Sequence, residues 1–105
     1  MKYTIIFSTC ANKKEAEKIA GALIKKKLVA CVNIIDKIES VFWWQGKADR
    51  AKEALLVIKS RQSKLDKIIG LVKSLHSYQV PEIIAVPVIG GNKAYLEWID
   101  ESLTL

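Results

Sequence analysis

The sequence lacks an apolar run long enough to cross a membrane. Its longest apolar stretches have the length of strands, whereas a membrane-spanning helix needs about 20 such residues. The first residues, Met1-Lys2-Tyr3, lead straight into a predicted strand. No separate apolar segment followed by a small-residue cleavage site is seen, so we find no secretion signal. We therefore expect a cytoplasmic protein with no membrane partner.

Cysteine and histidine are scarce. The chain has two cysteines, Cys10 and Cys31, and one histidine, His76. The cysteines form no CxxC pair, and in the cytoplasm we expect reduced thiols rather than a disulfide, with Cys31 buried in a strand and Cys10 more exposed in a loop. A histidine at the end of a predicted helix has an ordinary structural role, hydrogen bonding to the last carbonyls. In a symmetric oligomer, several copies of His76 could instead converge on a metal ion.

The motifs of common enzyme classes are missing. Gly90-Gly91 before Asn92 is too short a signal for a phosphate-binding loop, and a turn followed by a helix cap explains it. No two carboxylates are obviously placed for acid–base work. A nucleophilic thiol needs a base within hydrogen-bond reach, and only His76 is available to either cysteine. We therefore predict a protein that is not an enzyme.

The positive charge is spread along the chain. The formal net charge is +6, but the run Lys25–Lys27 falls at a helix end, where cations complement the helix dipole. Phe42, Trp43 and Trp44 could stack on bases, and the RNA-recognition module has a similar order of strands and helices. The third strand of that module carries aromatic residues and glycine, whereas residues 52–59 have neither. We therefore expect no nucleic-acid partner.

Four segments are typical of strands that are apolar on both faces. Side chains of a strand alternate between faces, so a sheet with one wet face alternates apolar and polar residues. These segments do not alternate, and the adjacent Trp43 and Trp44 place one ring on each face. The chain is too short to cover both faces with its own helices, so a second copy is the simplest cover. The segments are 3–7, 31–35, 54–58 and 83–89.

The order of the segments predicts β-α-β-β-α-β followed by a C-terminal helix. Asn12 and Glu15 match a capping box at the start of the first helix. We infer one α+β domain over residues 1–105, a ferredoxin-like sandwich whose two main helices lie on the same face of an antiparallel sheet. The helices are expected at about 13–28, at 63–76 with Ser63 as the cap, and after the cap Asn92.

The second and third strands contain the polar residues of most interest. Residues 30–45 form a long extended region with a bend or bulge at Asp36-Lys37. The turn is expected at residues 45–49, and the third strand near Glu53. Glu53 and Lys59 are six residues apart on that strand, so they share a face. Glu53 is expected to be partly buried.

Several groups of residues give this sequence a resemblance to the CutA family, the divalent-cation-tolerance proteins. The resemblance covers almost the whole chain, and its groups are specific when taken together in this order and spacing. It implies a homotrimer of ferredoxin-like subunits that is tied to tolerance and binding of copper and other divalent ions, with no established reaction. The groups are Ala30-Cys31-Val32-Asn33-Ile34, Trp44-Gln45-Gly46-Lys47 with Glu53 and Lys59-Ser60, His76-Ser77-Tyr78-Gln79-Val80-Pro81-Glu82-Ile83-Ile84, and Tyr95-Leu96-Glu97-Trp98-Ile99.

The resemblance also implies candidate site residues near clefts between subunits. Ser77 and Ala11 depart from the family by standing where it has proline, and Ser8 lies near the position of a cysteine proposed as a metal ligand. The candidates for a bound ligand are Trp44, Lys47, Glu53, Lys59, Tyr78 and Trp98. The candidates for copper or another divalent metal ion are His76, Glu82 and Cys10.

Two other functions are compatible with the same residues. PII-type trimers share the fold and bind small anionic ligands at subunit clefts, and Lys47, Lys59 and Arg61 could hold such an anion. The short loop from Gln45 to Lys52 argues against the long regulatory loop of that class. A structural hub without any small ligand is the third hypothesis, and the lysine-rich surface is compatible with a heat-stable version of it.

Overall fold

The structure, a computed structural model, describes residues 2–104 and has the order of elements that the sequence predicts. Among these residues, no helix is long and apolar enough to span a membrane. A single 3-10 turn over Gln62–Lys64 precedes the second helix. The elements are β1 (Tyr3–Cys10), α1 (Lys13–Lys25), β2 (Cys31–Trp44), β3 (Lys47–Arg61), α2 (Leu65–Leu75), β4 (Ile84–Pro87) and α3 (Lys93–Leu103).

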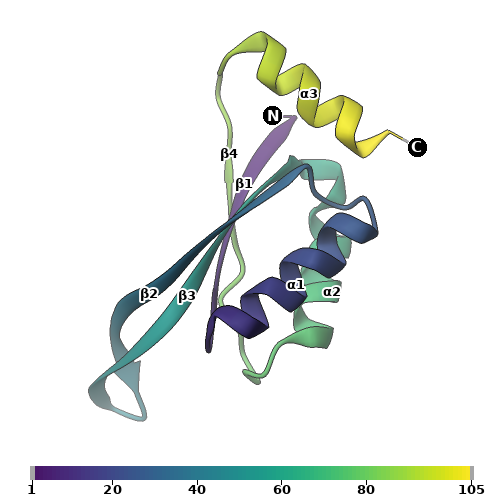
Figure 1. Cartoon of the computed structure of the whole chain (residues 1–105). Coiled ribbons are helices and arrows are strands. Elements are labelled where there is room, and N and C mark those ends of the chain that lie inside the picture. Colours follow the sequence, from purple (N-terminus) through teal and green to yellow (C-terminus); the bar gives the residue numbers. More distant parts are fainter. Residues whose placement is uncertain (1, 105) are drawn as a thin grey trace.

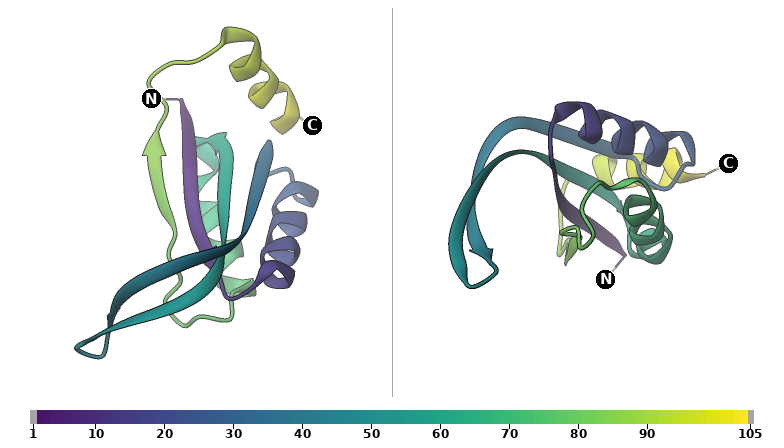
Figure 2. Two further views of the ribbon diagram at one scale, coloured as in Figure 1. Left: turned by 60° about the vertical axis from the view of Figure 1, so that its left-hand side comes forward. Right: turned by 90° about the horizontal axis from the view of Figure 1, so that it is seen from below.

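The four strands form one antiparallel sheet in the order β2-β3-β1-β4. Helices α1 and α2 lie side by side on one face of this sheet, and α3 lies at the end where β1 begins (Figure 1). The hairpin of β2 and β3 extends well beyond the part of the sheet that the helices cover, as both views in Figure 2 show. This arrangement confirms the predicted α+β fold with its two main helices on one face.

Helix α1 begins where the sequence predicts, with a small change in the cap. The Asn12 side chain accepts a hydrogen bond from the Glu15 amide at 2.8 Å, as expected of an N-cap. The Glu15 carboxylate bonds to the amide of Ala11 at 2.9 Å, whereas a standard capping box would return it to Asn12. Helix α1 ends at Lys25, about three residues before the predicted end.

The core lies between the sheet and the two helices. Every second residue of β1, starting at Thr4, is buried against them. Apolar side chains from β3, α1 and α2 complete this layer. Burial of side chains of this size contributes roughly 1.5–3 kcal/mol each to folding. The largest fully buried apolar side chains are Ile6, Ile19, Leu23, Leu56, Ile58, Ile68 and Val72.

The opposite face of the sheet is also apolar, and neither α1 nor α2 covers it. We call the residues of this surface the open face. Ile5 pairs with Val86, and Phe7 pairs with both Val57 and Ile84. Ile84 is 54% exposed and Val86 39%. The strands therefore carry apolar residues on both faces, as predicted, and one of these faces stays open in a single chain.

The long hairpin turns more sharply than the sequence suggests. Its tip is the two-residue turn Gln45-Gly46, with φ of 51° and 80°, and this geometry matches the right-handed twist of the flanking strands. Strand β3 therefore begins at Lys47, so the predictions of a five-residue turn and a start near Glu53 were wrong. The predicted bend is confirmed, because the pairing register shifts between Ile35 and Ile38.

Two further boundaries differ from the prediction. Ser63 lies inside the 3-10 turn, and the residue before α2 is Lys64, which makes no side-chain cap. Strand β4 covers only Ile84–Pro87 of the predicted 83–89. It is an edge strand next to β1, a position that tolerates proline. Just beyond its end, the Val88 amide still donates to the Tyr3 carbonyl at 3.1 Å.

Helix α3 is attached to the sheet through one carboxylate. Asp100 accepts hydrogen bonds from the Tyr3 hydroxyl at 2.6 Å and from the Arg61 guanidinium at 2.8 Å. The Tyr3 hydroxyl, together with the Lys2 and Arg61 charges, lowers the pKa of Asp100 despite the opposing effect of burial. Asp100 therefore stays ionised near neutral pH and joins α3 to β1 and β3.

Two buried serines of the core layer provide a matched test of this packing. Ser8 Oγ has no hydrogen-bond partner within residues 2–104, whereas Ser60 Oγ donates to the Leu28 carbonyl at 2.6 Å. Because a buried unpaired hydroxyl costs free energy, Ser8→Ala is expected to leave the free energy of unfolding unchanged or raise it by about 1 kcal/mol. Ser60→Ala is expected to lower it by about 1 kcal/mol. Urea denaturation measures both, and equal losses would contradict the assignment.

Candidate functional site

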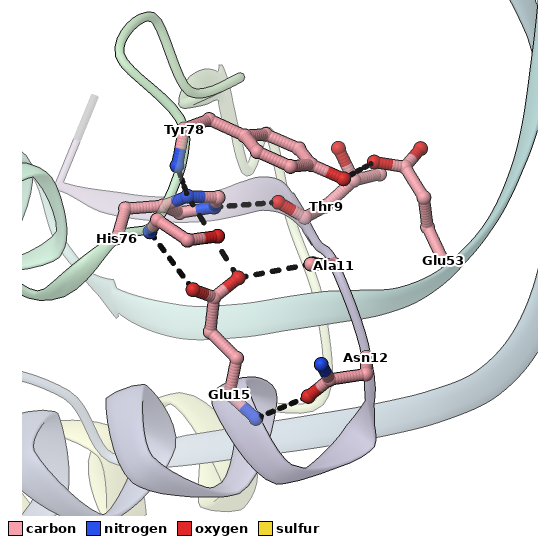
Figure 3. Close-up of polar contacts among 8 residues, drawn as sticks. Thr9, Ala11, Asn12, Glu15, Glu53, His76 and Tyr78 are labelled. Atoms are coloured by element: carbon pink, nitrogen blue, oxygen red, sulfur yellow. Dashed lines mark hydrogen bonds and ion pairs between the residues drawn. The ribbon is translucent and has the colours of Figure 1, made fainter.

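His76 is the centre of a buried polar cluster at the end of α2. Its side chain is fully buried. The ring nitrogen Nε2 lies 2.8 Å from the Thr9 carbonyl, and the Tyr78 amide donates to Nδ1 at 3.0 Å (Figure 3). An amide can only donate, so Nδ1 accepts and the proton of the neutral ring is on Nε2, which donates to Thr9. Both ring nitrogens are therefore used inside the protein.

Glu15 holds the other side of this cluster. Its two carboxylate oxygens accept hydrogen bonds from the amides of Ala11 and Ser77, the latter at 2.8 Å. Burial raises the pKa of the Glu15 carboxyl, but the hydrogen bonds from Ala11 and Ser77 outweigh burial and lower the pKa overall. Glu15 therefore joins the start of α1 to the segment after α2 as an ionised group (Figure 3).

Cys10 is the third member of the cluster and lies in the core. It is completely buried, whereas Cys31 is half-buried on the open face. The prediction that Cys10 is the more exposed thiol was wrong, because Cys10 is the last core-facing residue of β1 and not a loop residue. Burial, with the negative charges of Glu15 and Glu53, raises the pKa of the Cys10 thiol to about 12.

The atom types of the cluster are suited to a metal ion, but the hydrogen bonds of the His76 ring are not. Within residues 2–104, Cys10, Glu15 and His76 are the one group of three such side chains close enough to share an ion, with ligand atoms within 4.8 Å of one another. Sulfur, nitrogen and oxygen suit a borderline divalent ion. However, His76 Nδ1 already accepts a bond from the Tyr78 amide and Nε2 bonds to the Thr9 carbonyl, so both ring nitrogens are occupied. We therefore name these residues the His76 clasp, a linkage between β1, α1 and the segment after α2.

A cleft lies between the hairpin and the segment that the clasp holds. Its volume is about 820 Å³. The end of β1, the distal halves of β2 and β3, and the connection between α2 and β4 contribute to it. The bent hairpin and the connection between α2 and β4 border this space, which stays open to solvent at Val41, Trp44 and Val80. The lining residues are Thr9, Ser40, Val41, Phe42, Trp44, Asp49, Glu53, Tyr78, Gln79, Val80 and Glu82.

Glu53 is the buried charge of this cleft. It is only 8% exposed, and its Oε2 accepts a hydrogen bond from the Tyr78 hydroxyl at 2.7 Å. Burial and the adjacent Glu53 carboxylate raise the pKa of Tyr78, so the phenol stays protonated and continues to donate. Figure 3 shows the resulting path from the clasp through His76 and Tyr78 to Glu53. The clasp therefore sets the position of a carboxylate in the cleft.

The charge of the cleft is opposite to that of the chain. Asp49, Glu53 and Glu82 line it, and no lysine or arginine does, although the chain carries a formal charge of +6. Among residues 2–104, none of these three carboxylates is in an ion pair. Glu53 is buried, whereas Asp49 and Glu82 are exposed, so the cost of burying an unpaired charge falls on Glu53 alone. The cleft is therefore suited to cations.

The structure brings only some of the predicted site residues together. Trp44, Glu53, Tyr78 and Glu82 line the cleft. The predicted metal set is divided, because Cys10 and His76 lie in the clasp while Glu82 lies in the cleft. The others are elsewhere in this chain: Lys47 follows the hairpin tip, Lys59 contacts the Asn33 side chain on the sheet, and the Trp98 ring packs against Tyr95 on α3 at a tilt of 37°.

Sequence reasoning missed Glu15 and Asp49. Glu15 was interpreted only as a capping residue, and its second bond, to Ser77, joins positions 62 residues apart. Asp49 was placed in the turn, whereas it pairs with Phe42 across the hairpin. A reading that extended β3 back to Lys47 would have put Asp49 and Glu53, four residues apart, on one face of the strand.

Comparisons with known proteins agree with the resemblance seen in the sequence. The family model described as CutA1 divalent ion tolerance protein matches residues 4–102. The chain is 49% identical over 98 residues to Protein CutA 1, chloroplastic, of Oryza sativa, covering 93% of this chain and 55% of that protein. It is 44% identical over 101 residues to the divalent-cation tolerance protein CutA of Archaeoglobus fulgidus, covering 96% and 98%. The chain thus spans about half the length of the plant relative.

Solved structures match over nearly the whole chain. The periplasmic divalent cation tolerance protein CutA from Archaeoglobus fulgidus superposes with a TM-score of 0.94 at 43% identity, covering 97% of this chain and 99% of that one. CutA1 from Oryza sativa has a TM-score of 0.94 at 47% identity, covering 97% and 94%. These proteins share the α+β fold with the four-stranded sheet. The comparisons give no support to the PII-like alternative.

The buried, protonated state of Cys10 predicts a low reactivity. In a Cys31→Ser variant, alkylation of the remaining thiol at pH 8 is expected to be roughly a thousandfold slower in the native protein than in denaturant, because the thiolate is the nucleophile. Mass spectrometry of timed iodoacetamide reactions measures both rates. Equal rates would show that Cys10 is exposed and that the clasp is not closed.

Proposed function

This chain belongs to the CutA1 divalent ion tolerance family, and we propose from that membership that it acts in the response to divalent metal ions. It does so without catalysing a reaction, in the cytoplasm, as a homotrimer of ferredoxin-like subunits. The open face supports the trimer, because its exposed apolar residues Ile84 and Val86 need a cover that one chain does not provide.

The ligand of this function is copper or another divalent cation, and it binds in the cleft. The observation that supports this is the set of unpaired carboxylates at Asp49, Glu53 and Glu82 in a chain of net positive charge. Oxygen atoms are the ligands of hard divalent ions, which commonly keep several waters as well. These carboxylates do not form a preassembled group of ligands, so water or an adjoining subunit completes the coordination.

The clasp has a supporting role in this function. His76 and Cys10 do not contact the ion, because the ring nitrogens of His76 are bonded to Thr9 and Tyr78 and the Cys10 thiol is buried. They hold the segment that carries Tyr78, and Tyr78 holds Glu53 in the cleft. This differs from the set of ligands that the family resemblance implies, in which His76 and Cys10 bind the metal.

Calorimetric titration with Cu(II), and separately with Mg(II), tests the cleft. The double variant Glu53→Gln/Glu82→Gln is expected to lose at least about tenfold in affinity, since it removes two ligand charges. The matched control Glu97→Gln/Glu101→Gln removes the same charge from exposed positions of α3 and is expected to keep the affinity within about twofold.

A third variant separates the clasp from the cleft. Cys10→Ser is expected to keep the Cu(II) affinity within about twofold, because the thiol is not a ligand in this proposal. A large loss in Cys10→Ser, with unchanged affinity in Glu53→Gln/Glu82→Gln, would move the metal site to the clasp and overturn the proposal.

A further inference from the structure

The cleft has features that a metal ion alone does not explain. Its carboxylates are spread along the lining rather than gathered around one point, since Asp49, Glu53 and Glu82 do not form a metal-sized group within residues 2–104. A metal ion there takes its other ligands from water or an adjoining subunit, whereas a ligand with separated positive charges can reach carboxylates that lie apart.

The walls of the cleft are apolar and aromatic. Phe42 and Trp44 face it from β2, and Tyr78 and Val80 from the connection between α2 and β4. Trp44 is 60% exposed and Val80 87%, so these apolar groups gather around the cleft without being covered by the chain. Aromatic faces attract organic cations, and apolar walls pack against methylene groups.

We propose that the cleft binds an organic dication with an apolar body, of the class of aliphatic diamines and polyamines. The proposal rests on the function proposed above to the extent that both use Glu53 and Glu82, but it assigns a different class of ligand to the site. One ammonium group pairs with Glu53, a second reaches Glu82 or Asp49, and the methylene chain packs on Phe42 and Trp44.

The buried Glu53 carboxylate is the reason that we expect a positively charged ligand. Its carboxylate is more than nine-tenths buried, and its hydrogen-bond partner is the neutral phenol of Tyr78. A neutral donor satisfies one oxygen but leaves the charge uncompensated. Because no ion pair with Glu53 occurs within residues 2–104, an ammonium group from outside the chain supplies the missing charge.

The dimensions of the cleft agree with this class of ligand. A volume of about 820 Å³ is within the usual range of small-molecule sites, roughly 300–1,000 Å³. It greatly exceeds the space for one ion with its ligands and admits an extended chain of several methylene groups. Ser40, Thr9 and Gln79 add neutral polar groups to the lining, which can bond to further amines or to water.

Calorimetric titration at physiological salt tests the proposal with putrescine and spermidine as probes. Both are expected to bind, whereas 1,4-butanediol, a neutral analogue of putrescine, is expected not to bind, and the single charge of n-butylamine is expected to weaken binding at least about tenfold. Glu53→Gln is expected to weaken putrescine binding at least about tenfold, and Glu101→Gln to leave it within about twofold.

Two more variants keep the test decisive if Glu53→Gln does not fold. Glu82→Gln is expected to lower the affinity for putrescine more than the affinity for n-butylamine, because n-butylamine has no second ammonium group to pair with Glu82. Trp44→Ala is expected to lower the affinity for putrescine and leave the affinity for Mg(II) unchanged. The substitution removes an aromatic wall of the cleft but keeps all three carboxylates. Circular dichroism and thermal melting establish that each variant is folded.

The outcomes separate this inference from the proposed function. Binding of Cu(II) or Mg(II) without binding of either amine overturns the dication proposal and leaves the metal function in place. If the amines bind and the metal ions do not, the result supports the dication proposal and overturns the proposal that the cleft binds a metal ion. If neither binds, both proposals fail, and the missing charge of Glu53 is then supplied by a second copy of the chain. Amine binding that is unchanged in Glu53→Gln and Glu82→Gln also overturns the inference.

Discussion

The sheet has two apolar faces, and the two main helices α1 and α2 cover only one of them. Strand β1 shows this most clearly, because Ile6 is fully buried beneath α1 and α2 while Ile5 and Phe7 point to the open face. Water contact with this second apolar surface is unfavourable by roughly 25 cal/mol for each Å² that remains exposed. In a single copy of the chain, much of the apolar surface of the sheet therefore stays in contact with water. The long hairpin, which projects beyond the helices, adds further apolar surface at Val41 and Trp43.

The cleft depends on the same hairpin and on the His76 clasp. The bulge between Ile35 and Ile38 bends the hairpin, and the clasp holds the segment opposite it. Tyr78 joins the two parts through its bond to Glu53. The clasp is closed by hydrogen bonds from three backbone amides, so it positions a buried carboxylate without needing a metal ion. The residues that line the cleft thus differ from Cys10 and His76, which the sequence singles out first.

The sequence contained most of the fold but only part of the site. Periodicity placed α1 and its Asn12 cap, and the lack of alternation revealed the two apolar faces. Both are local patterns. The start of β3 was missed because Lys47-Ala48-Asp49-Arg50 is polar, and only pairing with Phe42 and its neighbours makes it a strand. The exposure of Cys10 and the second bond of Glu15 depend on contacts with residues far along the chain. Such contacts leave no signal in spacing.

Sedimentation equilibrium of the purified protein over a wide range of concentration tests the central claim most directly. If a second copy covers the open face, the mass is a multiple of the 11.8 kDa chain, and the proposed homotrimer gives three times that value. A mass of 11.8 kDa at all concentrations would mean that the open face stays in water. That result would contradict the account of the sheet and remove the support for clefts between subunits.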